Sequence, residues 1–204
     1  MGLDENIYQL RRDKLAQIEA LGQPAYPHKY EFTHSVPQVL ADYSLKSGEE
    51  LESARVNVRV PGRIVALRLM GKAAFAHVQQ GGQKLQIYVK KDAVGDPQWD
   101  LFKLLDIGDH IGVAGYLFRT RTGELSIHVE QLTFLAKDLL PLPEKWHGLS
   151  DVETRYRQRY VDLVMNPEVR ETFVKRSRVV QSLRNFFDAR GYIEVETPIM
   201  HSIV

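Results

Sequence analysis

The chain has 204 residues, enough for one large domain or for a small domain with part of a second one. Hydrophobic residues make up 44% of it and charged residues 26%, which is ordinary for a globular protein and excludes an intrinsically disordered chain. The net charge of +1 excludes binding to nucleic acid through bulk positive charge, so any such binding must come from a local arrangement of residues.

Cysteine is absent from the sequence, which excludes disulfide bonds and thiolate metal sites and is typical of proteins of the reducing cytosol. No apolar run approaches the roughly 20 residues that a membrane-spanning helix needs, and the first residues lack the apolar core of a signal peptide. We therefore predict a cytoplasmic protein that makes no contact with a membrane.

The N-terminal segment, residues 1–52, is predicted to be a helical extension. Apolar residues recur at helical spacing along residues 4–21, and Gly22 and Pro24 follow as signals that end a helix. A second, short helix is predicted over residues 35–44, with Ser35 as its cap.

The pattern changes to a period of two from residue 55 to about residue 135, which predicts β-strands. A bulge or bend is expected at Pro61-Gly62, and Gly81-Gly82 predicts a tight turn. Strands are predicted over residues 56–60, 63–69, 73–79, 84–89, 111–120 and 125–135, and a helix over residues 97–105.

If the interrupted first strand is counted once, the segment has five strands with a helix between the third and the fourth. This order is typical of the OB-fold, a small Greek-key barrel whose face binds oligonucleotides. The predicted class is therefore mainly β with helices (α+β), with the barrel over residues 53–140. An SH3-like barrel is the main alternative, although the inserted helix argues against it.

The last segment, residues 141–204, begins with a linker that contains prolines and a glycine. A helix is predicted to start near Ser150. A longer helix follows Asn166-Pro167, which is typical of a helix cap followed by proline at the first helical position. This helix carries an apolar stripe and ends at Gly191, and residues 192–200 then form a predicted extended apolar strand that is closed by Pro198.

Side-chain alternation places a mixed aromatic and polar surface on the outside of the predicted barrel. Residues 74, 76, 78, 85, 87 and 89 are apolar and suit a tight interior, so Phe75, His77, Gln86 and Tyr88 face outward. Aromatic rings among hydrogen-bonding groups are typical of surfaces that bind single-stranded RNA, where each stacked base contributes roughly 1–3 kcal/mol. The alternative is that a loop or the N-terminal helix covers Phe75, and that Gln86 and Arg68 are simply solvated.

Two groups of residues resemble motifs of a known enzyme family. The helix that ends at Gly191 and the segment closed by Pro198 resemble motif 1 of the class II aminoacyl-tRNA synthetases. The anticodon-binding domain of the lysyl-, aspartyl- and asparaginyl-tRNA synthetase subgroup is similar to Gly62-Arg63-Ile64, Arg68, Met70-Gly71-Lys72, Phe75 and Gln86. The resemblance covers essentially the whole chain.

This resemblance implies that the barrel binds the anticodon stem-loop of a tRNA. Phe75 would stack on the central uracil of the anticodon, and Arg68 and Gln86 would hydrogen-bond to anticodon bases. Glu124 would help to read the first anticodon base. Three strings, residues 22–27, 68–72 and 120–126, resemble the lysyl form, so the implied partner is the lysine tRNA.

The family joins an amino acid to its tRNA, so the resemblance implies a longer lysine–tRNA ligase that uses ATP and Mg²⁺ and forms a lysyl-adenylate. Motif 1, here Gly191 and Pro198, would build its homodimer interface. Neither motif 2 nor motif 3 is found, so we expect this chain alone to be inactive and to bind neither ATP nor a metal ion. A fragment of an aspartyl- or asparaginyl-tRNA synthetase and a stand-alone OB-fold single-strand binder remain alternatives.

Residues 155–163, RYRQRYVDL, also resemble this subgroup. Their plain interpretation is a basic helix face, with the arginines solvated or paired with carboxylates and with Tyr156, Tyr160 and Leu163 packed. The alternative is a contact with tRNA phosphates.

Overall fold

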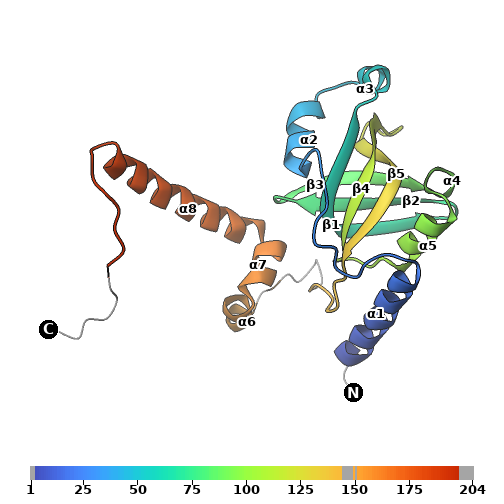
Figure 1. The fold of residues 1–204 in the computed structure, drawn as a ribbon, viewed down its shortest axis with the longest axis horizontal. Coiled ribbons are helices and arrows are strands. Elements are labelled where there is room, and N and C mark those ends of the chain that lie inside the picture. Colours follow the sequence, from blue (N-terminus) through green and yellow to red (C-terminus); the bar gives the residue numbers. More distant parts are fainter. Residues whose placement is uncertain (1–2, 144–148, 150, 198–204) are drawn as a thin grey trace. The chain divides into compact units, whose positions relative to one another are not determined.

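The computed structural model describes residues 3–143, 149 and 151–197, in two compact units that comprise residues 1–142 and 143–204 (Figure 1). The first unit is built around a closed barrel in which the strands follow the order β1-β2-β3-β5-β4. The β3–β5 pair is parallel and the other pairs are antiparallel. The strands are β1 (Asn57–Met70), β2 (Ala73–Gln80), β3 (Gln83–Lys90), β4 (His110–Arg119) and β5 (Leu125–Ala136). The predicted five-stranded barrel is confirmed.

Buried and more exposed residues alternate along the strands, and the buried ones fill the barrel interior with apolar side chains. Ala74, Ala76 and Val78 on β2 are buried, as the sequence predicted, and small residues suit a barrel of only five strands. Helices contribute to the same core through Ile18 and Leu51. Other fully buried members are Val58, Val60, Ile64, Leu85, Ile87, Val89, Ile111, Val113, Leu117, Ile127, Val129 and Phe134.

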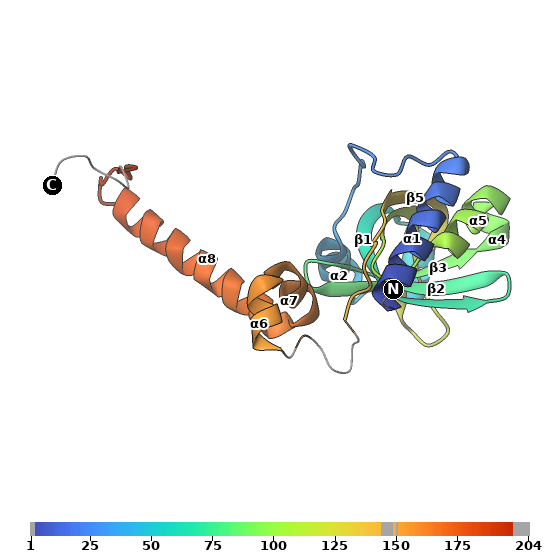
Figure 2. The same ribbon diagram turned by 90° about the horizontal axis from the view of Figure 1, so that it is seen from below.

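The first unit also contains five helices in its described residues, and Figure 2 shows several of them beside the barrel, seen from below. They are α1 (Leu3–Ala20), α2 (Val36–Tyr43), α3 (Gly48–Ala54), α4 (Lys91–Val94) and α5 (Asp96–Leu104). Ser35 caps α2 as predicted, since its side chain accepts from the amide of Gln38. Helix α3 was not predicted, although Ser47 and Glu50 form the same reciprocal capping box.

The irregularity in β1 lies elsewhere than predicted. The strand runs through Pro61-Gly62 without a break, and the register shift falls between Ile64 and Ala66. The strand pairs with β4 from Asn57 to Arg63 and with β2 from Arg63 to Met70. Gly62 has a packing role instead, because a Cβ there would lie 2.9 Å from the Cβ of Val78.

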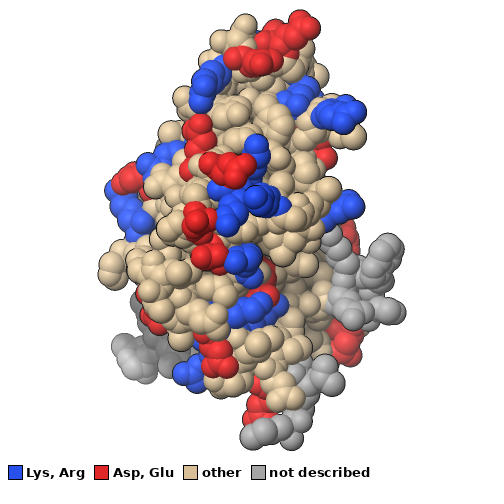
Figure 3. Space-filling view, turned by 90° about the vertical axis from the view of Figure 1, so that its right-hand side faces the viewer, with Lys and Arg blue, Asp and Glu red and all other residues tan. Residues whose placement is uncertain are grey.

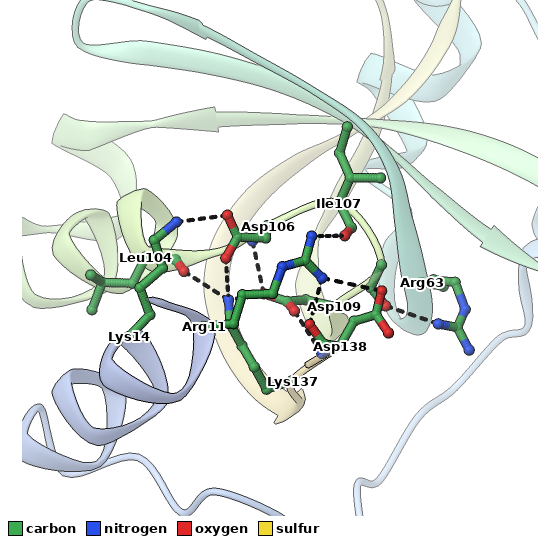
Figure 4. Close-up of polar contacts among 10 residues, drawn as sticks. Arg11, Lys14, Arg63, Leu104, Asp106, Ile107, Asp109, Lys137 and Asp138 are labelled. Carbon is green, nitrogen blue, oxygen red and sulfur yellow. Dashed lines mark hydrogen bonds and ion pairs between the residues drawn. The ribbon is translucent and has the colours of Figure 1, made fainter. Parts of the chain in front are cut away.

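An ion-pair network holds α1 against one end of the barrel (Figure 4). Lys14 on α1 lies 2.6 Å from Asp106, and the buried ammonium of Lys137 donates to Asp106 at 2.6 Å and to Asp109 at 2.7 Å. Burial alone would raise the pKa of Asp106, but the hydrogen bonds from Lys137 and Lys14 outweigh it and hold that pKa below its usual value. The network therefore fixes the helical extension to the barrel as one body.

The second unit contains α6 (Val152–Arg157), α7 (Arg159–Met165) and α8 (Pro167–Asp188). Its centre is the buried carboxylate of Asp162, which accepts from Arg155 at 3.1 Å, from Asn166 at 2.6 Å and from Arg159. Asn166 stands at the N-cap position before Pro167, but its side chain bonds to Asp162 and makes no capping bond. The predicted positions of the cap and of the proline are therefore confirmed, but the Asn166 side chain does not cap the helix.

The sequence predicted that the arginines of residues 155–163 are solvated or paired with carboxylates. Pairing is confirmed for Arg155, Arg157 and Arg159. The packing predicted for Tyr156 and Tyr160 is wrong, since both are 70% exposed.

The strand predicted over residues 192–200 is not seen in its described part, because residues 192–197 pair with no other strand. Residues 198–200 lie outside the described part of the chain.

Within the described residues, no helix is both long enough and apolar enough to cross a membrane.

Candidate nucleic-acid interface

The predicted site residues stand in two neighbouring rows across the barrel surface. In the first row, Arg68 on β1 is directly opposite Phe75 on β2, which is opposite Tyr88 on β3. In the second row, His77 on β2 is opposite Gln86 on β3. Because opposite residues in a sheet point to the same side, the register alone brings the side chains of Arg68, Phe75 and Gln86 onto one surface.

Phe75, His77 and Gln86 from these rows form the floor of an open groove of about 550 Å³. One wall is the end of β1 with Arg68 and Met70, and the other is the β4–β5 hairpin with Thr120, Arg121 and Thr122. Gly123, at φ +83°, provides the left-handed backbone that turns this hairpin. The groove thus combines aromatic, amide, hydroxyl and guanidinium groups, which are the groups that bind an unpaired base.

Phe75 lies in this groove and is partly exposed. Its ring centroid is 4.9 Å from that of Tyr88, at an interplanar angle of 34°, so Tyr88 holds the ring from one side. Helix α1 packs against α5 and the 106–109 loop instead of covering Phe75. A supported and partly exposed ring is suited to stack on a base.

Glu124 and Gln86 are joined in a hydrogen-bonded chain. The Gln86 Nε2 donates to Glu124 Oε2 at 2.7 Å, while the hydroxyl of the buried Ser126 donates to Gln86 Oε1 at 2.8 Å. The other carboxylate oxygen of Glu124 lies 3.1 Å from His77 Nε2. The two predicted base-reading side chains are therefore already oriented in the free protein.

His77 and Ser126 were not chosen from the sequence as site residues. Alternation placed His77 on the outer face, yet its contact with Glu124 spans 47 residues and depends on how the barrel closes. Their role is visible only in the folded chain.

The charge of the barrel unit is mixed. Seen from the right-hand side of Figure 1, where α4 and α5 lie, Lys and Arg side chains alternate with Asp and Glu (Figure 3). Ion pairs such as Lys91–Asp96 and Lys103–Asp100 lie in this region. This face presents no field of a single sign, in agreement with a net charge of +1.

The predicted motif 1 residues lie in the other unit. Gly191 has φ +80°, and the amide of Tyr192 after it donates to the carbonyl of Phe187 at 3.2 Å, which closes the end of α8 in the manner of a glycine C-cap. Pro198 lies outside the described residues. Among residues 3–143, 149 and 151–197, no three His, Asp or Glu side chains are placed to share a metal ion.

Comparison with known proteins matches both units. Residues 58–135 match the family model described as an OB-fold nucleic acid binding domain, and residues 151–204 match the model of class II tRNA synthetases (D, K and N). The lysine–tRNA ligase of Halalkalibacterium halodurans is 51% identical over 203 residues, which are 100% of this chain and 40% of that protein. The lysine–tRNA ligase of Bacillus subtilis is 48% identical over 195 residues, 96% of this chain and 39% of that protein.

The chain spans about two-fifths of the length of the curated relatives that it matches. Over this whole length it corresponds to the N-terminal portion of the lysine–tRNA ligases, with an OB-fold nucleic-acid-binding barrel followed by the beginning of a class II synthetase domain.

Proposed function

We propose that the barrel binds the unpaired anticodon loop of the lysine tRNA. In this proposal Phe75 stacks on the central uracil, Arg68 and Gln86 hydrogen-bond to anticodon bases, and Glu124 contributes to reading the first base. The observation that carries the proposal is the groove in which Phe75, Arg68 and Gln86 meet, with Gln86 2.7 Å from Glu124. A stacked ring flanked by fixed donors and acceptors discriminates between bases through their Watson–Crick edges.

The full-length protein is, in this proposal, a cytoplasmic lysine–tRNA ligase that uses ATP and Mg²⁺. The support is the similarity to lysine–tRNA ligases along the whole chain. We assign ATP and Mg²⁺ to the full-length protein, and we expect this chain alone not to activate lysine because neither motif 2 nor motif 3 is found in its sequence. Residues 1–52, 53–140 and 141–204 would serve as extension, anticodon-binding barrel and start of the catalytic domain.

The full-length protein is further proposed to be a homodimer built on α8 and the segment around Gly191 and Pro198. The support is the apolar surface of α8, where Leu183 is 55% exposed and Phe187 48%. Apolar surface of this kind is usually covered by a partner.

RNA binding tests the barrel. Hairpins whose loop carries UUU or a scrambled triplet are titrated against the wild-type chain and against Phe75→Leu. We expect UUU to bind more tightly, and Phe75→Leu to lose about 1–3 kcal/mol of that binding. The matched control is Phe32→Leu, since Phe32 is 55% exposed in the same unit and does not line the groove. Equal affinity of the wild type for both hairpins would remove the anticodon proposal.

Exchange of pyrophosphate into ATP tests the enzyme assignment. The full-length protein should catalyse it with lysine and this chain should not. Exchange with aspartate or asparagine in place of lysine would assign the protein to a sister enzyme, and no exchange with any amino acid would favour a stand-alone RNA-binding protein.

A further inference from the structure

The aromatic surface continues well beyond Phe75. Tyr88 on β3 is directly opposite His128 on β5, and His128 is directly opposite Tyr116 on β4. The Tyr88 and His128 rings are 5.5 Å apart, and the His128 and Tyr116 rings are stacked at 4.8 Å with an interplanar angle of 10°. Burial lowers the pKa of His128, which favours the neutral ring. One row of rings therefore crosses β2, β3, β5 and β4.

A second groove, of about 380 Å³, lies at the far end of this row between β4 and α3. It is lined by Leu51, Glu52, Arg55, Tyr116, Phe118 and Arg119. Its volume falls within the range of about 300–1,000 Å³ that is usual for sites of small ligands. The Phe118 ring lies 6.1 Å from that of Tyr88, so rings connect the second groove to Phe75 without interruption.

The second groove is rigidly built on one side. The guanidinium of Arg119 donates to the carbonyl of Ser44 at 2.6 Å and to that of Lys46 at 2.7 Å. These bonds tie the loop before α3 to the C-terminal end of β4. The groove therefore does not depend on the position of a free loop.

Arg55 stands in an unusual backbone conformation at this groove. It is the C-cap of α3, with φ 39° and ψ 61°, and among the described residues it is the one residue other than glycine with a positive φ. An arginine at such a position costs free energy that glycine avoids, and strain of this kind is often found at ligand sites. Its guanidinium lies 5.0 Å from the centroid of Tyr116 and pairs with Glu130 at 3.2 Å.

We propose that this second groove is a nucleobase subsite, occupied by one further unpaired nucleotide of the RNA strand whose anticodon lies over Phe75. The proposal rests on the proposed function of the barrel. Phe118 provides aromatic surface for the base, and Arg55, whose guanidinium lies over Tyr116, provides a planar cation that stacks on a base or pairs with its phosphate. The continuous row of rings gives the strand an aromatic path from the first groove to the second.

Arg55→Gly separates binding from folding. Glycine relaxes the left-handed C-cap, so this variant should unfold at the same urea concentration as the wild type or at a higher one, while its affinity for the UUU hairpin falls about tenfold. A second test compares Arg55→Gln with Arg59→Gln, and Arg59→Gln is the matched control. Arg59 also lies over a tyrosine, at 5.4 Å from the centroid of Tyr30, but lines neither groove. Only the Arg55 variant should weaken binding by such a factor.

The occupant is identified by removing single bases from the hairpin loop. Each loop nucleotide outside the UUU triplet is made abasic in turn, and binding is measured to the wild type, to Arg55→Gln and to Phe118→Leu. One abasic position should weaken binding to the wild type and have no further effect on either variant. If no position behaves in this way while Phe75→Leu still weakens binding, the second subsite is refuted and the anticodon proposal stands. If Phe75→Leu has no effect either, the anticodon proposal itself fails.

Discussion

The two compact units of this chain differ in the type of residue that they bury. The barrel unit encloses an apolar core that includes Phe102 and Phe134, both fully buried. In the described part of residues 143–204, the buried residue is the carboxylate of Asp162, and Phe186 and Phe187 on α8 are about half exposed. Helices thus form in both units, yet among the described residues only those of the first unit enclose an interior that is held together by the hydrophobic effect.

This difference explains why the polar contacts have opposite roles in the two units. In the barrel, the Lys137–Asp109 pair and its neighbours fasten α1 to a body that apolar packing already stabilises. In the second unit, the bonds of Arg155, Arg159 and Asn166 to Asp162 are the centre of the packing. Substitutions in each unit and a change of pH test this contrast.

Removal of a phenylalanine should have very different effects in the two units. Phe134→Ala opens a cavity in the barrel and should lower its free energy of unfolding by about 3–5 kcal/mol. Phe187 on α8 is 48% exposed, so Phe187→Ala should change the free energy of unfolding of its own unit by less than about 0.5 kcal/mol. Urea unfolding followed by near-ultraviolet circular dichroism measures both. Similar losses in the two variants would show that α8 also contributes to a common core.

An added methyl group should also destabilise the barrel unit at a position that is already tightly packed. A Cβ on Gly112 would lie 2.3 Å from the ring of Tyr30, so Gly112→Ala must displace the N-terminal segment and should cost about 1–3 kcal/mol. Gly48→Ala is the matched control, because a Cβ there meets its nearest atom at an ordinary 3.7 Å. Thermal unfolding of the two variants gives the comparison, and an unchanged melting temperature for Gly112→Ala would contradict the tight packing of residue 30.

Loss of the central carboxylate should loosen the second unit alone. Asp162→Ala removes the acceptor for Arg155, Arg159 and Asn166, and hydrogen bonds to a charged group contribute about 1.5–3 kcal/mol each. Hydrogen exchange should speed up in α6 and α7 and stay unchanged in β1–β5. Asp151→Ala, which removes only the cap of α6, is the smaller control. Faster exchange in the barrel would mean that the two units are coupled.

Acid should also destabilise the second unit before the barrel, and this is the smallest of the expected effects. Burial would raise the pKa of Asp162, but hydrogen bonds from Asn166 and Arg155 hold it below its usual value, so the stability that it contributes is complete at neutral pH. This contribution is lost as the pH falls below about 4 and through the folded-state pKa. In the barrel, burial raises the pKa of Asp138, which opposes the lowered pKa of Asp106. Exchange in α7 should therefore rise at a higher pH than exchange in β1–β5, and Asp162→Asn should abolish that rise.

The sequence predicted the barrel well because local periodicity and register decide most of it. Alternation along β2 and β3 placed Phe75 and Gln86 on the outer face, and the structure brings them into one groove with Arg68. Helix α3 could have been found, since Ser47 and Glu50 are spaced as a capping box.

Other features depend on contacts that sequence patterns do not contain. The bond between His77 and Glu124 requires closure of the barrel, and the unexpected bond of Asn166 requires Asp162 to be buried. Tyr156 and Tyr160 were expected to pack beside a basic helix face, yet both are largely exposed. The strand predicted from residue 192 had the right composition, but a strand needs a partner, and the described residues provide none for residues 192–197.

The order of strands in the barrel also determines how the chain can fold. The last strand, β5, enters between β3 and β4, and its pairing with β3 joins Gln86 to Ser126 across a long stretch of chain. Contacts between distant residues slow folding because their loop entropy is lost before they form. During synthesis, β3 keeps an open edge until the residues of β5 that pair with it, Ser126 to Val129, have been made, and an open edge is a site of wrong pairing. The barrel is therefore most vulnerable to misfolding in the interval between synthesis of β3 and release of β5 from the ribosome.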